Sequence, residues 1–310
     1  MSRGPTRLVS RRDELNRRWS ASAVLTLVIA GLIPSLADAY TAAGDRNFPA
    51  TLVLPQVAPI DGFWVTPQAL PQTSGMPPMN GTQTQLTGTY SKMITERLGI
   101  QFKGGYTNFR STNTAQNFNV VLNYEAILNQ PHEFVLSVLL GQNFGSHGNN
   151  LPPSPATTPA ITFAKGFGDL PIGYLRPLAI TGYAGYSAAQ GARPNAVTTG
   201  FSVQYSIPYL LSKVTDIDLP PFLRGMTPLT EFQYIHAVGP NYGHKPQLLV
   251  APGISYTQGR GWEAGIEALV PATKAAGRGV GVIAQLVIQL DYLLPNSIVG
   301  RPIFPLNELR

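Results

Sequence analysis

The alternation of apolar and polar residues is the feature that most constrains this chain. From Gly279 to Tyr292, every second residue is apolar, and the residues between them are mostly polar. That period of two is typical of a β-strand with one apolar and one polar face. The same alternation recurs along most of the chain from about Thr84 onward, and no segment has the helical period that would cover the apolar faces. The sheet must therefore close on itself or pack on a second sheet.

A closed barrel with its apolar residues outside satisfies every backbone group in lipid. We therefore predict an all-β fold, a transmembrane antiparallel β-barrel. Eleven strands are legible after Thr84. Barrels of this kind have an even number of strands, and residues 61–70 supply a first strand, which brings the total to about 12. A soluble β-sandwich is the alternative at the level of the fold.

The connections between strands alternate in length, which supports the barrel. If the last strand ends in the periplasm, the external connections are 145–160, 190–197, 239–247 and 274–277. These include the long polar ones, whereas the intervening connections near Gln130, Asp169 and Arg260 are short, as in outer-membrane barrels. A long connection at 209–226 is the exception. Less regular strands are predicted over 161–168 and 172–187.

The first 39 residues have the organisation of an export signal. Four arginines provide a basic start, residues 21–32 are apolar, and Ala37-Asp38-Ala39 has the small residues that signal peptidase accepts. The apolar run is shorter than the ~20 residues that span a bilayer. We expect a signal peptide over 1–39, cleaved near Ala39. Residues 40–83 are rich in proline, and they either lie in the periplasm or enter the lumen as a partial plug. The barrel would then occupy 84–294 and a C-terminal tail 295–310.

Composition excludes several functional classes. The net charge is +6, but the predicted signal peptide accounts for +3 of it, which leaves no case for nucleic-acid binding. The chain has no cysteine, and its four histidines lack the spacing of a metal site. No phosphate-binding glycine loop and no nucleophile with an oriented base are apparent. We therefore expect no cofactor, no metal and no enzymatic activity.

Charged residues on the predicted inward faces are the candidates for lumen chemistry and selectivity. They are Lys103, Glu125, Glu231, Glu263, Glu267 and Asp291. Carboxylates that line a pore favour cations, so a cation preference is one interpretation. The other interpretation is that these groups pair with Arg and Lys of the loops or simply hydrate the lumen. We favour this second interpretation, because any such barrel has polar lumen residues. A small hydrophobic cargo is a further alternative, because lumen positions such as Leu139, Ile283 and Val287 are apolar.

Three segments carry a resemblance to a known family. Residues 281–304 (GVIAQLVIQLDYLLPNSIVGRPIF), Ser206–Leu210 and Gly265–Ala268 resemble uncharacterised proteobacterial outer-membrane barrels, putative transporters of the MetA-pathway of phenol degradation type. The resemblance spans roughly the C-terminal third and implies a small outer-membrane channel or transporter. Members of this class usually end on an aromatic residue that the barrel-assembly machinery reads. Here Phe304 or Tyr292 would serve.

These patterns together predict a channel in the bacterial outer membrane for small solutes, surrounded by outer-membrane lipid. A structural barrel that holds a partner in an envelope complex is the alternative. A barrel enzyme is the least favoured interpretation.

Overall fold

A computed structural model describes residues 41–71, 83–109, 112–145, 155–190, 194–239, 245–257, 259 and 261–305. The described residues belong to one compact unit of the chain, Asp38–Arg310. The predicted signal peptide (1–39) lies outside the described residues, so its cleavage site stays a prediction.

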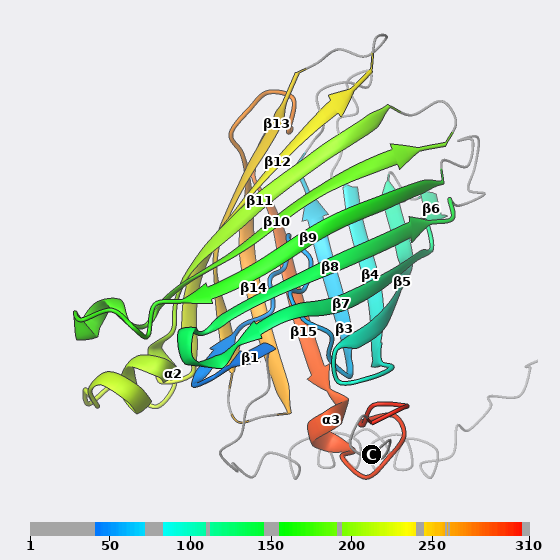
Figure 1. The fold of residues 1–310 in the computed structure, drawn as a ribbon. Coiled ribbons are helices and arrows are strands. Elements are labelled where there is room, and N and C mark those ends of the chain that lie inside the picture. The colour runs from blue at the N-terminus through cyan, green and yellow to red at the C-terminus, as the bar shows by residue number, and fades with distance from the viewer. Residues whose placement is uncertain are drawn as a thin grey trace, which may run out of the picture. The chain divides into compact units, whose positions relative to one another are not determined.

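The wall of the unit is a closed antiparallel barrel of 12 strands, as predicted (Figure 1). Its strands are β3 (Gly62–Leu70), β4 (Gln83–Met93), β5 (Leu98–Phe109), β7 (Asn119–Asn129), β8 (Phe134–Asn143), β9 (Ala156–Gly166), β10 (Leu178–Ala189), β11 (Asn195–Tyr205), β12 (Met226–Val238), β13 (Gln247–Thr257), β14 (Trp262–Pro271) and β15 (Gly281–Gln289). The short β6 (Thr112–Ala115) pairs with β5. Pairing of β15 with β3 closes the barrel, which confirms the first strand predicted at 61–70.

The two ends of the barrel differ in their connections. We call the end at which β15 finishes the tail end and the opposite end the loop end. Turns at the tail end carry four short helical segments between strands, namely η1 (Gln130–His132), η2 (Gly173–Leu175), α2 (Ile207–Tyr209) and η3 (Leu210–Val214). A further one, α3 (Leu290–Leu293), follows β15. The alternation of connections follows the prediction, and the long connection after β11 lies at the tail end.

Several strand boundaries differ from those predicted. β9 begins at Ala156 and not at residue 161, because Ala156–Pro159 pair with the loop-end residues of β8 despite their turn-like composition. β10 begins at Leu178 and not at residue 172, since η2 occupies the start of that stretch. The last strand ends at Gln289, where the N–H of Leu290 donates to the carbonyl oxygen of Asp61 and α3 begins.

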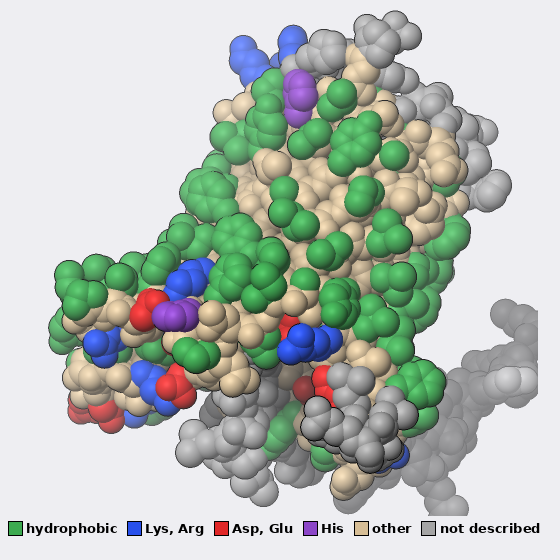
Figure 2. Space-filling view, viewed as in Figure 1, with side chains coloured by type: hydrophobic (Ala, Val, Ile, Leu, Met, Phe, Trp, Pro, Cys, Tyr) green, Lys and Arg blue, Asp and Glu red, His purple; other side chains and the backbone are tan. Residues whose placement is uncertain are grey.

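The outer face of the barrel is apolar. Outward positions around the wall expose large apolar side chains, among them Phe63, Leu86, Leu122, Val138, Ile161, Phe201, Ile254, Ile266 and Leu286. Figure 2 shows few charged side chains across the middle of the visible face, whereas charged groups gather toward the ends. An apolar outer band on a closed barrel is the surface that faces lipid. None of the described helices is long and apolar enough to cross a membrane.

Adjacent aliphatic residues on β7 provide a test of this outward face. Leu122 points outward, whereas Val121 pairs with the inward Gln101 and faces the lumen. Leu122→Arg should lower the free energy of unfolding in liposomes by about 2 to 4 kcal/mol, the cost of a lipid-facing arginine near mid-membrane. Val121→Arg should cost much less. Guanidinium titration measures both, and equal losses would contradict the assigned faces.

Candidate functional site: the lumen and its N-terminal segment

Residues 41–60 occupy the lumen, and we call them the plug. The plug starts with a hairpin of β1 (Thr41–Ala43) and β2 (Arg46–Phe48), and residues 49–60 then run without regular structure to β3. Figure 1 shows this segment running inside the barrel wall. Between Phe48 and Ile60 most residues are buried, and Phe48 is only 2% exposed. Of the two placements left open by the sequence, the lumen is therefore the one observed.

The carboxylate of Glu231 holds the middle of the plug. Three successive backbone N–H groups, those of Leu52, Val53 and Leu54, donate to its two oxygens at 2.5, 3.2 and 2.7 Å. Consecutive N–H groups that converge in this way form an anion-binding concavity, here filled by a side chain of the wall. The N–H of Ala50 donates to Glu263 at 3.1 Å, and the hydroxyl of Ser255 also donates to Glu263. Two carboxylates of the wall thus satisfy four N–H groups of a segment without secondary structure.

Apolar inward side chains pack against the plug from several sides. Leu52 packs with Ala251, Leu269 and Ile283. The other two buried clusters are Ala50 and Ile60 with Trp64 and Val287, and Ala43, Phe48, Val57 and Ala58 with Val135, Ala164 and Ala179. Inward glycines leave room for this packing, since a Cβ at Gly265 would lie 2.8 Å from Cδ1 of Leu52. The apolar inward residues therefore match an occupant that belongs to the chain itself.

A buried polar cluster fixes the plug at the tail end, and we call it the latch. The guanidinium of Arg46 donates to Glu133 at 3.2 Å and to the carbonyl oxygens of Pro177 and Arg176, and it stacks on the ring of Tyr209 at 3.8 Å. The hydroxyl of Tyr209 donates to Glu133 at 2.8 Å. Burial, together with this hydrogen bond, raises the pKa of Tyr209 to about 12. The latch thus joins β2 to three separate connections of the wall, those between β7 and β8, β9 and β10, and β11 and β12.

The predicted lumen residues fall into three groups. Glu231 and Glu263 bind the plug, while Glu267 and Glu125 face the lumen but are also buried. Lys103 faces the lumen, as its pairing with Thr89 and Asn119 shows, and its side chain is exposed to solvent there. The register places five of the six predicted residues on inward positions, and their role in selectivity stays a prediction.

Asp291 is the exception among the predicted lumen residues. It lies in α3 beyond the end of β15, so it is not part of the lumen wall. Burial raises the pKa of its carboxyl above the ordinary value. The alternation of the final strand was extrapolated two residues too far at this point.

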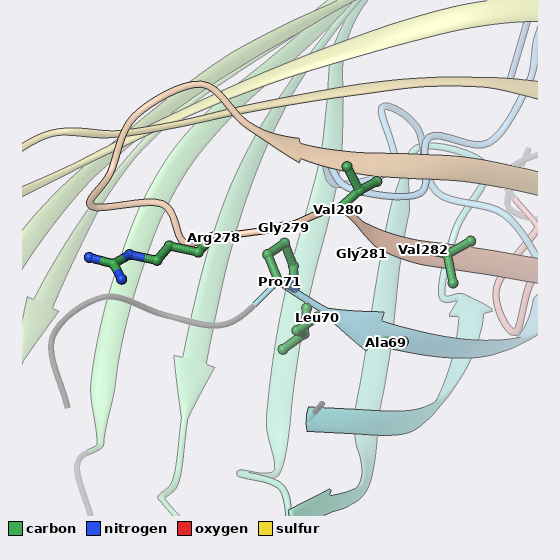
Figure 3. Close-up of a pocket in the computed structure, with 8 residues that line it drawn as sticks. All are labelled: Ala69, Leu70, Pro71, Arg278, Gly279, Val280, Gly281 and Val282. Atoms are coloured by element: carbon green, nitrogen blue, oxygen red, sulfur yellow. The ribbon is translucent and has the colours of Figure 1, made fainter. Parts of the chain in front are cut away.

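A pocket of about 350 Å³ lies at the loop end of the seam between β3 and β15. It is lined by the end of β3, by the start of β15 and by Arg278, Gly279 and Val280 of the connection before β15 (Figure 3). In the figure the side chain of Arg278 extends away from Leu70 and Pro71. The pocket is therefore a feature of the rim, and one of its lining residues, Leu70, also packs against the cluster around Leu52.

Comparison with known proteins gives likenesses of structure alone. No protein-family model matches the sequence, and no curated protein matches it. The NanC porin is similar at 12% identity and a TM-score of 0.48, covering 73% of this chain and 98% of that chain. The KdgM porin is similar at 11% identity and a TM-score of 0.46, covering 73% of this chain and 98% of that chain. An outer-membrane channel from Pseudomonas putida F1 is similar at 9% identity and a TM-score of 0.48, covering 78% of this chain and 99% of that chain. Because all three TM-scores are below 0.5, we base the function on this chain's own residues.

Sequence reasoning missed the latch. Arg46, Glu133 and Tyr209 lie in connections and in the proline-rich segment, where no periodicity marks them. One signal did point to the plug, namely the apolar residues at inward positions, such as Ile283 and Val287, which a water-filled lumen does not require. They indicate an occupant, although they do not identify it.

Removing the acceptor on Glu231 should loosen the plug. In Glu231→Gln, one oxygen becomes an N–H₂ donor that faces backbone donors, and a hydrogen bond to a charged group contributes about 1.5 to 3 kcal/mol. Amide hydrogen exchange of residues 50–54 should therefore accelerate at least about tenfold. The matched control is Glu125→Gln, because Glu125 is also a buried lumen carboxyl but makes no hydrogen bond or ion pair with the described residues of the plug. Equal exchange in the two variants would contradict the anchoring role.

The latch should weaken at high pH. Because the pKa of Tyr209 is raised in the folded state, its contribution to stability is complete below pH 10 and is lost as the pH rises through about 12. Tyr209→Phe lacks this contribution at every pH. The difference in free energy of unfolding between wild type and Tyr209→Phe should shrink between pH 10 and 12 in guanidinium titrations. A constant difference would show that the hydroxyl is not held in this environment.

Proposed function

We propose that the protein is an outer-membrane channel for small solutes whose flow the plug controls. The observation that carries this proposal is a lumen with two unlike halves. Toward the tail end, and along β12 to β15 and β3, it is packed with the plug or carries apolar inward residues such as Leu249 and Leu269. Toward the loop end of β4, β5, β9 and β11, inward positions are polar, for example Gln85, Thr107, Thr158 and Thr198, and Lys103 on β5 is exposed. A purely structural barrel has no need of a hydrated half-lumen that ends on a separable segment.

The way in which the plug is attached would allow it to move relative to the barrel wall. Cleavage of the predicted signal peptide near Ala39 would leave the mature chain starting one residue before the plug. The plug would then be tethered covalently at β3 alone and held elsewhere by the latch and the carboxylates of Glu231 and Glu263. Contacts of this kind break without disturbing the barrel ladder. We therefore infer that a shift of the plug sets the conductance.

The nature of the cargo is also part of this proposal. The resemblance to putative transporters of the MetA-pathway type suggests a small hydrophobic compound. However, Ile283 and Val287, two of the apolar lumen positions that would receive such a cargo, are packed against the plug. A hydrophilic solute fits the exposed half of the lumen better, and no catalytic role is needed for its passage.

A disulfide between plug and wall tests the proposal, since the chain has no cysteine of its own. Leu52→Cys with Gly265→Cys places the two thiols where the Leu52 side chain now meets the wall. In planar bilayers, the reduced double variant should conduct, and oxidation should lower the current several-fold, with recovery on adding reductant. Leu52→Cys alone is the control and should not respond.

Two outcomes would contradict the proposal. A correctly folded, heat-modifiable barrel that carries no current, reduced or oxidised, would favour a structural barrel that holds an envelope partner. A current that the disulfide leaves unchanged would show that solutes pass beside a fixed plug, and plug control would be wrong.

A further inference from the structure

The two ends of the barrel differ in the sign of their charge. The sequences that join strands at the loop end are 71–82, 110–118, 144–155, 190–194, 239–246 and 272–280. They contain no Asp or Glu, and their charged residues are Arg110, Arg193, Lys245, Lys274 and Arg278. Of these, Lys245, Lys274 and Arg278 are described, and all three are exposed. A solute that approaches this end therefore meets positive charge.

The described carboxylates either lie at the tail end or are buried on the inward face of the wall. Glu96, Glu133, Asp169, Asp216 and Asp218 belong to connections at the tail end. The four inward glutamates, Glu125, Glu231, Glu263 and Glu267, are each at most 9% exposed. The carboxylates that would attract cations are therefore withdrawn from the hydrated half of the lumen.

Lys103 is the one charged side chain on the inward strand positions of the hydrated half, among the described residues. Its pairing partners across β4 and β7 are the neutral Thr89 and Asn119. None of the ion pairs of the described residues includes it. Its charge is thus not cancelled by a neighbouring carboxylate and acts on whatever enters the lumen.

We propose that the hydrated half-lumen selects small hydrophilic anions, with Lys103 as the attracting charge and the basic loop end as its funnel. A ring or cluster of one sign in a narrow passage with low-dielectric walls raises the local concentration of the opposite ion. The amides and hydroxyls around Lys103 supply hydrogen bonds without competing charge. This inference rests on the proposed channel function, of which it names the class of solute. It also replaces the cation preference that the buried glutamates would have given.

Reversal potentials across a salt gradient measure the selectivity directly. The full-length barrel in phosphatidylcholine bilayers, which lack lipopolysaccharide, should pass chloride in preference to potassium. Lys103→Gln should reduce that preference, and Lys103→Glu should reverse it. Lys165→Gln is the matched control, because Lys165 pairs with Phe134 on the outward register at the tail end and the change of charge is the same. Cation preference in the wild type, or no response to Lys103→Glu, would overturn the inference.

A second measurement does not depend on conduction. Thr89→Cys creates a single thiol directly across from Lys103, and its rates with an anionic sulfonate and a cationic ammonium thiol reagent report the local potential. The anionic reagent should react faster, and Lys103→Gln should lower the ratio of rates by about three- to tenfold, as expected for one charge roughly 6 Å away in water. An unchanged ratio would refute the role of Lys103. A barrel that conducts no current but still shows this ratio of reaction rates would refute the channel function and leave the role of Lys103 standing.

Discussion

The contact between the Glu231 carboxylate and three consecutive N–H groups of the plug is the interaction on which the interior of this barrel depends. Residues 49–60 form no helix or strand, so their backbone donors must be satisfied from outside the segment. A carboxylate accepts such bonds strongly, and burial in the lumen removes competing water. Without Glu231 and Glu263, the plug would enter the lumen with unsatisfied donors, and the packing of Leu52 would have to offset that cost.

Wall and plug are complementary in more than polarity. The inward face places Gly265 and Ala251 beside Leu52, and it places Trp64 and Val287 beside Ala50. A sheet with a period of two can vary its inner face independently of its outer face, because adjacent residues along a strand point to opposite sides. The outward residues are mostly apolar, while the inner face varies from packed at the plug to exposed around Lys103. The same strands thereby form the apolar outer surface and the wall that binds the plug, and in the proposed channel they also line the solute path.

Much of the fold followed from the sequence, because the period of two fixes which residues face inward. Lys103, Glu125, Glu231, Glu263 and Glu267 were placed correctly for that reason. Strand ends were less predictable: Ala156–Pro159 resemble a turn, yet they pair because β8 offers a partner, and Asp291 lies in α3 because the chain turns at Leu290. The plug contacts could not be predicted, since Leu52 and Glu231 are 179 residues apart and residues 49–60 have no periodicity. Consequently the sequence placed the carboxylates on inward positions but did not predict that Glu231 and Glu263 bind the plug.

The most direct test of a lumen filled by the chain's own N-terminal segment is photocrosslinking in native outer membranes. Phe48 is buried against Val135, Ala164 and Ala179, which lie on β8, β9 and β10. With p-benzoylphenylalanine in place of Phe48, irradiation should crosslink it within the same chain to peptides from those three strands, as identified by mass spectrometry. Crosslinks to lipid or to other envelope proteins, with none to these strands, would show that the segment lies outside the barrel and would contradict the plug.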